Sequence, residues 1–481
     1  MRKTVQYLLF MLPVSLVLGS CTKWLDVKPQ DKFTDVQIFS SKPLLLQAMN
    51  GIYLSISKNT LYGDNLTMSV PELLAQNYNI PVSHSYTAYA SYNYADATVA
   101  AKFSTIWENA YAAVANANIF LQSLNASPGI ISPAQDSVLR GEAIALRAYL
   151  QFDVLRLFGP MYNSSDSTLP GIPYYTKTTS GYNPYLPANA VMDSITADLL
   201  KAEQLLANDP VILYGVKGNP SPNEDPFFQN RNLRMNYYAV KALQARVYMY
   251  RGDKVRAYAA AQTFIQSTTS TFPWVLFANV ITNKANPDRI FSTELVFSLQ
   301  CLDMYSNYST HYDPGVLDAN IFAPLDARLT AVMESATYPN DYRLNPCWIY
   351  PNTGTKTYRT FYKYADVSST STSFRYTMPM IRKSEMYYIA AECAPDNTTA
   401  LGYLNTVRLN RGLPNLTAGT VAVPEILKEY QKEFYGEGQL FYYYKRTNAS
   451  AIPTGSAASG NITMDKSKYV LPLPLSETGF H

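Results

Sequence analysis

Residues 132–159 constrain the fold more than any other stretch of the chain, because they predict a long helix that is apolar around most of its circumference. Ser132 and Pro133 suit a helix start, and Gly159-Pro160 suits its end. Between these signals, apolar residues recur at helical spacing on two adjoining faces: Ala145, Leu146, Tyr149, Leu150, Phe152, Val154 and Leu157. Two such faces are too wide for a helix at the surface. We therefore expect a central helix enclosed by neighbouring helices.

Helical hairpins recur on both sides of this helix. Residues 236–265 carry small residues and a glycine at the spacing of one tetratricopeptide unit: Ala245, Tyr248, Gly252 and Ala257. Residues 103–158 and 384–409 form comparable pairs. Such hairpins cannot bury their apolar faces alone, so three or more stack. We predict a mainly α fold, a tetratricopeptide-like α-α superhelix, with its helical repeat scaffold in residues 103–158, 187–267 and 384–446.

Two regions, 59–98 and 268–380, lack helical period and are rich in Tyr, Asn and Ser. We expect them to be largely irregular, with few short strands such as one near Leu295-Val296-Phe297. The chain has 40 tyrosines beside 4 tryptophans and 20 phenylalanines. A tyrosine offers an apolar face and a polar tip, and long loops in compact domains are usually functional or disordered. The predicted ligand-binding residues are Tyr78, Tyr86, Tyr89, Tyr305, Asn307, Tyr308 and Trp348, with ordinary loop packing as the alternative for each.

Composition and motifs exclude several function classes. The formal charge is +3, from 39 basic and 36 acidic residues, which predicts no nucleic-acid partner. Three scattered histidines favour neither a metal site nor a His-based triad, and no glycine-rich phosphate loop follows a strand. We therefore expect no metal, no cofactor and no catalytic residue. Asp303, Asp313 and Asp318 could include a glycosidase pair, but 36 acidic residues offer such pairs by chance.

The amino terminus predicts a lipoprotein signal. Arg2-Lys3 precede an apolar run too short to span a bilayer, and small residues precede Cys21. We expect residues 1–20 to be removed, Cys21 to carry acyl chains and residues 21–40 to form a lipid-anchored tether. An ordinary secretory signal with a chance cysteine is the alternative. Cys301 and Cys347 could form a disulfide, which sequence leaves open.

Several motifs in order resemble the SusD/RagB family of outer-membrane nutrient-binding lipoproteins. The central helix carries Gly141-Glu142-Ala143, Leu146-Arg147-Ala148-Tyr149 and Leu155-Arg156-Leu157-Phe158-Gly159. The other motifs are Trp107, Tyr111, Val114 and Asn118, the run Met378 to Glu385, the helix Glu433 to Arg446 and a closing Leu-Pro strand at Val470 to Pro474. The resemblance covers most of residues 21–475, and we treat residues 41–475 as a single SusD-like domain.

The resemblance implies a lipid-anchored protein of the outer membrane that faces the cell exterior. It implies capture of oligosaccharides or polysaccharide fragments and their delivery to a SusC-like, TonB-dependent transporter, without turnover. A peptide-binding member of the same family is the first alternative, and a glycan-active enzyme is the second. Glu142, Arg147, Arg382 and Glu385 lie beside core positions of predicted helices, and we expect them to form structural ion pairs or caps and not to act in catalysis.

Overall fold

The computed structural model of the protein describes residues 41–163, 165–178, 181–352 and 354–479. The signal segment 1–20, the tether 21–40 and the lipidation site Cys21 lie outside these residues, so the expectations for them stay predictions.

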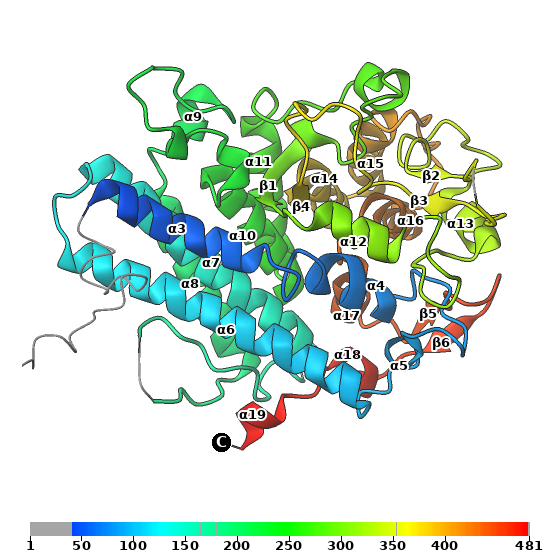
Figure 1. Cartoon of the computed structure of the whole chain (residues 1–481), viewed down its shortest axis with the longest axis horizontal. Helices are drawn as coiled ribbons and strands as arrows, with labels where there is room; N and C mark the ends of the chain where they lie inside the picture. Colours follow the sequence, from blue (N-terminus) through cyan, green and yellow to red (C-terminus); the bar gives the residue numbers. More distant parts are fainter. Residues whose placement is uncertain (1–40, 164, 179–180, 353, 480–481) are drawn as a thin grey trace, which may run out of the picture.

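Stacked helices form the scaffold (Figure 1). Helix α6 packs on α7, α7 on α8, α8 on α10, α10 on α11, α11 on α14 and α14 on α15. This succession of neighbouring helical hairpins confirms the predicted mainly α superhelix. The scaffold helices are α3 (Lys42–Ile56), α6 (Ala97–Ala126), α7 (Pro133–Phe158), α8 (Ala188–Leu205), α10 (Tyr237–Arg251), α11 (Lys254–Ser267), α14 (Lys383–Glu392), α15 (Asn397–Leu409), α16 (Ala422–Glu433) and α17 (Leu440–Arg446).

Helix α7 is the enclosed helix that the sequence predicts. The Ser132 side chain accepts a hydrogen bond from the Gln135 N–H at 3.3 Å, and every residue from Gly141 to Phe158 is buried. A Cβ at Gly141 would stand 2.5 Å from Leu206 Cγ, so the glycine lets the end of α8 approach α7 closely. The close approach explains why a glycine is used inside a helix that it otherwise weakens.

The four residues predicted to form structural ion pairs or caps all form buried ion pairs. Arg147 and Glu142 of α7 pair with Asp198 at 2.6 Å and Arg231 at 2.7 Å. In the later part of the chain, Glu385 pairs with Arg246 at 2.6 Å and Arg382 with Glu437 at 2.9 Å. These charges therefore join helices and loops inside the core.

Region 59–98 is irregular but does not protrude from the domain. It contains a π-helical turn (Asn65–Ser69), α4 (Val70–Leu74) and α5 (Thr87–Ala90), and residues 65–76 are all buried. Region 268–380 holds α12 (Met304–His311) and α13 (Asp326–Met333), together with strands of two antiparallel pairs. These pairs are β1 (Leu295–Gln300) with β4 (Thr377–Arg382) and β2 (Trp348–Ile349) with β3 (Thr360–Phe361).

The remaining elements are short. Strands β5 (Ala451–Pro453) and β6 (Asn461–Thr463) form a third antiparallel pair. The short helices are α9 (Pro210–Tyr214), α18 (Lys466–Tyr469), α19 (Leu475–Thr478), the 3-10 turns at Pro226–Phe228, Arg231–Leu233 and Ser292–Glu294, and a π-helical turn at Ala278–Thr282.

Two expectations near the carboxyl end need correction. Residues 433–446 are not one helix, because Gly436 and Gly438 at φ +76° and +71° form a turn between α16 and α17. Residues 470–474 do not form a strand, although the Leu471 N–H donates to the Leu157 carbonyl at 3.1 Å. Both features depend on contacts with distant segments, which local sequence patterns do not reveal.

The cysteines in the described part of the chain are free. Cys301 and Cys347 are buried, and no disulfide joins them. Cys393 directly follows the last residue of α14 and is partly buried. Burial raises the pKa of the Cys347 thiol to about 11, so the thiol stays protonated at neutral pH.

Candidate functional site

The two loop-rich regions meet at the end of the molecule that carries α5, α13, β2 and β3 (Figure 1). The Asn79 N–H donates to the Ala323 carbonyl at 2.8 Å, and the Ser85 N–H donates to the Ala319 carbonyl at 3.0 Å. Ser85 Oγ also donates a hydrogen bond of 2.9 Å to Asn320 Oδ1, and we call this line of contacts between the two regions the seam. The structure therefore brings segments together that are more than 200 residues apart in sequence.

Five of the seven predicted ligand-binding side chains lie in the core beneath this surface. Their exposed fractions are 7% or less, which leaves neither a ring face nor an amide group accessible to a ligand: Tyr78, Tyr89, Asn307, Tyr308 and Trp348. Their polar atoms bond inside the protein, as Tyr78 Oη does to the Met68 carbonyl at 2.7 Å and Asn307 Nδ2 to the Gly63 carbonyl at 2.9 Å. In these irregular segments the aromatic rings form the core, and we no longer place them in the site.

The buried rings form a rigid base. Tyr78 stacks on Phe322 with ring centroids 4.6 Å apart and shares a hydroxyl contact of 2.8 Å with Tyr312. Trp348 packs edge-on against Tyr435 at 4.7 Å. Burial holds the pKa of Tyr78 well above its ordinary value, so its hydroxyl remains a neutral donor.

Tyr86 and Tyr305 are half-buried and lie in different surroundings. Tyr86 packs edge-on against Phe322 at 4.8 Å, at the seam between the two regions. Tyr305 packs on Tyr376 at 4.6 Å, with the Arg375 guanidinium 5.3 Å from its ring. Of these two residues, Tyr86 is the one that borders the seam.

Two further tyrosines flank the turn between β2 and β3, of which Tyr350 is exposed and Tyr358 is half-buried. Tyr350 is 48% exposed, donates to Asp326 Oδ2 at 3.1 Å and lies 4.8 Å from the Arg359 guanidinium. Tyr358 donates to Asp318 Oδ1 at 2.6 Å. Hydrogen bonds from Lys356 and Tyr358 lower the pKa of Asp318, which keeps this acceptor ionised.

We define the tyrosine face as Tyr86, Asp318, Asn320, Tyr350, Tyr358 and Arg359. The hydroxyls of Tyr350 and Tyr358 are held by carboxylates, so the rings have fixed orientations before any ligand arrives. The amide of Asn320, the carboxylate of Asp318 and the guanidinium of Arg359 belong to the same face. This arrangement suits a ligand with an apolar face and hydrogen-bonding edges.

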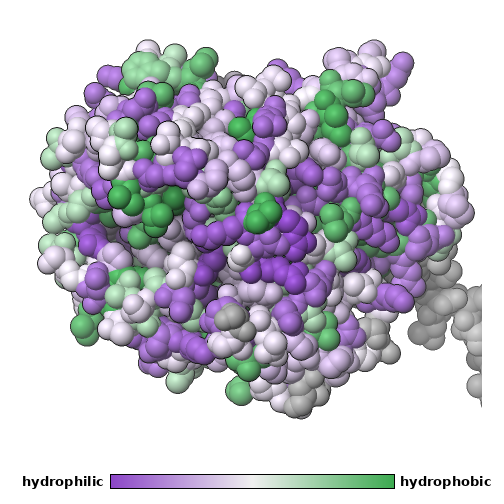
Figure 2. All heavy atoms as spheres, turned by 180° about the vertical axis from the view of Figure 1, so that it is seen from behind, coloured by the Kyte–Doolittle hydropathy of each residue, from purple (hydrophilic) through white to green (hydrophobic). Residues whose placement is uncertain are grey.

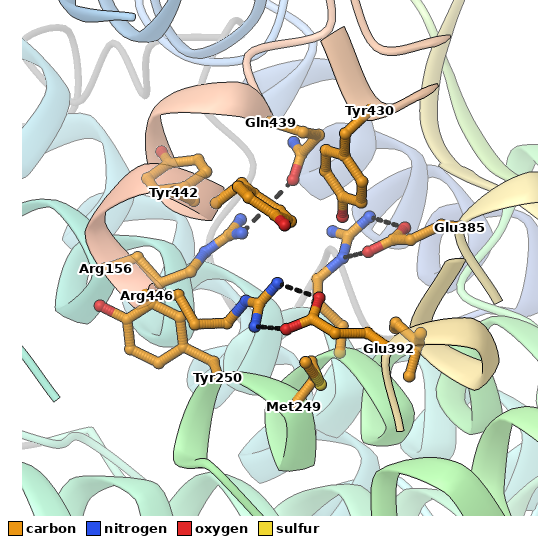
Figure 3. A pocket seen from close by; sticks show the side chains of 12 residues that line it. Arg156, Met249, Tyr250, Glu385, Glu392, Tyr430, Gln439, Tyr442 and Arg446 are labelled. Carbon is orange, nitrogen blue, oxygen red and sulfur yellow. Dashed lines mark hydrogen bonds and ion pairs between the residues drawn. The ribbon is translucent and has the colours of Figure 1, made fainter. Parts of the chain in front are cut away.

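A second cluster of aromatic and charged side chains lies inside the scaffold (Figure 3). It encloses a cavity of about 30 Å³ between α7, α10, α14, α16 and α17. Arg246 pairs with Glu385 at 2.6 Å, and Arg446 bonds both oxygens of Glu392 at 2.8 Å. A cavity of this size holds only water, so we assign the cluster to the packing of the scaffold.

Comparison with known proteins places the chain in a family. Residues 23–217 match a family described as starch-binding and associating with the outer membrane, and residues 297–471 match the SusD family. The two matches together cover most of the chain. The chain belongs to the SusD/RagB family.

SusD-like relatives cover nearly the whole chain. SusD-like protein P38 of Formosa agariphila is 23% identical over 515 residues, covering 93% of this chain and 92% of the relative. A SusD superfamily protein of Bacteroides thetaiotaomicron shares the fold with a TM-score of 0.69 at 21% identity, over 91% of this chain and 98% of the other. A structure described as a laminarin-binding SusD-like protein gives a TM-score of 0.61 at 18% identity, over 91% and 97%.

Membership of the SusD/RagB family describes a binding protein and not an enzyme. Of the carboxylates considered for glycoside hydrolysis, Asp313 Oδ1 accepts from the Gly315 N–H at 2.8 Å, and Asp318 Oδ1 accepts from the Tyr358 hydroxyl at 2.6 Å.

The surface of this SusD/RagB protein is mixed in polarity. On the side opposite to the view of Figure 1, apolar side chains form small groups among polar ones (Figure 2). Among the helices of the described residues, none is long and apolar enough to cross a membrane.

Among the residues of the tyrosine face, sequence reasoning predicts only Tyr86 as a ligand-binding residue and misses the others: Asp318, Asn320, Tyr350, Tyr358 and Arg359. One signal could have found the two tyrosines. The polar run Pro351 to Thr357 lies between the two tyrosines and is typical of an exposed turn, whereas Trp348 and Phe361 at the outer ends are apolar. Aromatic residues next to such a turn are more accessible than those farther along each strand.

Proposed function

We propose that the protein is a cell-surface lipoprotein that binds oligosaccharides or polysaccharide fragments on the tyrosine face and delivers them to a TonB-dependent outer-membrane transporter. The observation that carries this proposal is the pair of tyrosines, Tyr350 and Tyr358, whose hydroxyls are held by Asp326 and Asp318.

Sugar chemistry fits this surface. The C–H groups on one face of a pyranose ring rest on an aromatic ring, while the hydroxyls at its edge need groups such as Asn320 and Arg359. Two stacking contacts and a few hydrogen bonds, at about 1 kcal/mol each, leave only a modest net free energy of binding once the cost of association is subtracted. We expect dissociation constants of roughly micromolar to millimolar, which suit capture followed by release.

The charges of the site favour a neutral glycan. Asp318 pairs with Lys356, and Asp326 with Arg359 at 3.4 Å, so the carboxylates beside the two tyrosines are balanced by cations. An anionic polysaccharide would have no uncompensated cation to pair with here. The starch-binding description of the family and the laminarin-binding neighbour both concern neutral glucose polymers, which makes such polymers the first ligands to test.

Anchoring and delivery complete the proposal. Acyl chains on Cys21 would hold the protein at the outer membrane, at about 0.8 kcal/mol for each buried methylene. Metabolic labelling with a palmitate analogue should label the wild type and not Cys21→Ser. Co-purification from the native membrane tests the transporter, and recovery of the protein without a TonB-dependent partner would contradict delivery.

Isothermal titration calorimetry with a panel of ligands tests the binding function. The panel contains starch-type and laminarin-type oligosaccharides, an anionic oligosaccharide and a mixture of short peptides. We expect saturable heats with at least one neutral oligosaccharide, little dependent on salt. Peptide binding without glycan binding would instead support the peptide-binding branch of the family.

A further inference from the structure

A cavity of about 360 Å³ lies between α6, the crossover that leads from α7 to α8, and α19 near the carboxyl end. Figure 1 shows these three parts along one edge of the molecule, away from β2, β3 and α13. Its walls include Trp107, Tyr111, Val114 and Asn118, the motif on α6 that the proposed glycan site does not use.

The inner wall is aromatic. The rings of Trp107 and Tyr111 are 4.8 Å apart, and Tyr111 meets Tyr175 edge-on at 5.6 Å. Val114 and Pro173 add buried aliphatic surface. The wall thus offers ring and aliphatic carbon atoms over most of its area.

The polar atoms of these rings are engaged within the protein. Trp107 Nε1 donates to Glu477 Oε2 at 3.2 Å, and Tyr111 Oη donates to the Pro173 carbonyl at 2.9 Å. Tyr175 Oη accepts from the Asn183 N–H at 3.2 Å. A sugar placed here would lose hydration of its many hydroxyls without gaining as many hydrogen-bond partners, which is unfavourable.

An apolar ligand has no such penalty. A dry cavity of about 150 Å³ lined by apolar side chains is sufficient to bind benzene, and this cavity is more than twice as large. Ile119 and Tyr182 are 38% and 57% exposed at its rim, so a ligand can reach it from solvent. Lys177 and Glu477 also line the cavity and supply polar contacts.

We propose that this cavity is a second binding site, for a compact and mainly apolar ligand that carries an aromatic ring. The proposal does not depend on glycan binding at the tyrosine face. Ring faces of the ligand would pack against Trp107, Tyr111 and Tyr175, and a single polar group would point toward the rim.

Calorimetric titration with indole and with 4-methylphenol tests the site, with glucose as the hydroxyl-rich comparison. The variant is Ala115→Phe, which puts a ring into the cavity from an exposed position on α6. The matched control is Ala112→Phe, one helical turn away, exposed and outside the cavity lining. We expect sub-millimolar binding of one aromatic probe to the wild type and control, at least about tenfold weaker binding to Ala115→Phe, and no saturable heat with glucose.

Three results would overturn the proposal. Neither aromatic probe binds the wild type, or Ala115→Phe and Ala112→Phe bind the aromatic probe with equal affinity, or glucose binds the wild type as well as the aromatic probes do. Circular dichroism shows whether Ala115→Phe folds. If it does not fold, Tyr182→Ala replaces it and should weaken binding of the aromatic probe several-fold. Unchanged binding of the probe to Tyr182→Ala would contradict the site. The best oligosaccharide for the tyrosine face should bind Ala115→Phe normally, which separates failure of this site from failure of the proposed function.

Discussion

Two tyrosines of the loop-rich regions, Tyr78 and Tyr350, differ in the partner of the hydroxyl group and in exposure. Tyr78 donates to a main-chain carbonyl of the core, and its ring is enclosed on both faces. Tyr350 donates to Asp326 at the surface and leaves 48% of its side chain exposed. A surface carboxylate thus fixes the ring without covering it, which reduces the conformational entropy lost on binding.

Glu72 is a single residue with an expected effect on the pH dependence of stability. It is fully buried and accepts from Asn77 Nδ2 at 2.6 Å and from the Gly438 N–H at 2.7 Å. Burial outweighs these bonds and raises the pKa of its carboxyl from 4.5 to about 7. Between these two values the folded state binds more protons than the unfolded state, so the free energy of unfolding falls as pH rises.

We therefore predict that Glu72→Gln removes a stability loss of up to about 3 kcal/mol between pH 4.5 and pH 7.5. Urea unfolding of the wild type and the variant at both pH values measures this difference. Glu108→Gln, at an exposed position on α6, is the control and should keep the wild-type pH dependence. Parallel pH profiles for the wild type and Glu72→Gln would contradict the assignment.

At the scale of elements, one arginine connects several helices. Arg231 pairs with Glu142 of α7 at 2.7 Å and with Asp209, the capping residue of α9, at 2.8 Å. Tyr53 of α3 donates to the other oxygen of Glu142 at 2.8 Å. All these charges are buried, so the cation compensates two carboxylates that have no access to water.

Arg231→Met should therefore lower the free energy of unfolding by about 3–5 kcal/mol, because two buried carboxylates lose their cation. Arg256→Met is the matched control, since Arg256 pairs with Asp253 on the surface, and its loss should be at most about 1 kcal/mol. Urea denaturation of both variants provides the comparison. Equal effects for the two would mean that burial does not determine the strength of these pairs.

The helices were largely predictable because their signals are local. The cap at Ser132, the apolar spacing along α7 and the turn at Gly252 follow from neighbouring residues, and Gly252 indeed has a φ of +80°. The site was not predictable to the same degree. Whether Tyr78 or Tyr350 is exposed depends on segments such as 313–323, which pack on region 59–98 from a distant part of the sequence.

At the scale of the whole molecule, a buried charge network joins the scaffold to the loop-rich region. Glu433 of α16 bonds Arg411 at 2.6 Å and Arg343 at 3.3 Å, and Arg411 also bonds Glu294 at 2.6 Å. Arg382 of β4 contacts Glu433 as well. Loss of either part would leave charges of the other part buried without partners.

Residues 41–475 should consequently unfold in one cooperative transition. Far-ultraviolet circular dichroism follows the scaffold helices, and near-ultraviolet circular dichroism follows the aromatic core of the loop-rich regions. We expect coincident midpoints, and in Glu433→Gln both should fall together. Two separated transitions would show that the loop-rich part is an independent unit.

The most direct test of glycan capture is calorimetric titration of the best oligosaccharide into the double variant Tyr350→Ala/Tyr358→Ala. Loss of two stacking contacts of about 1 kcal/mol each should weaken binding about 30-fold. Tyr214→Ala is the control, because Tyr214 is 47% exposed on α9, at the other end of the molecule (Figure 1). We predict an affinity within about twofold of the wild type for this control. Wild-type affinity in a folded double variant would contradict binding at the tyrosine face.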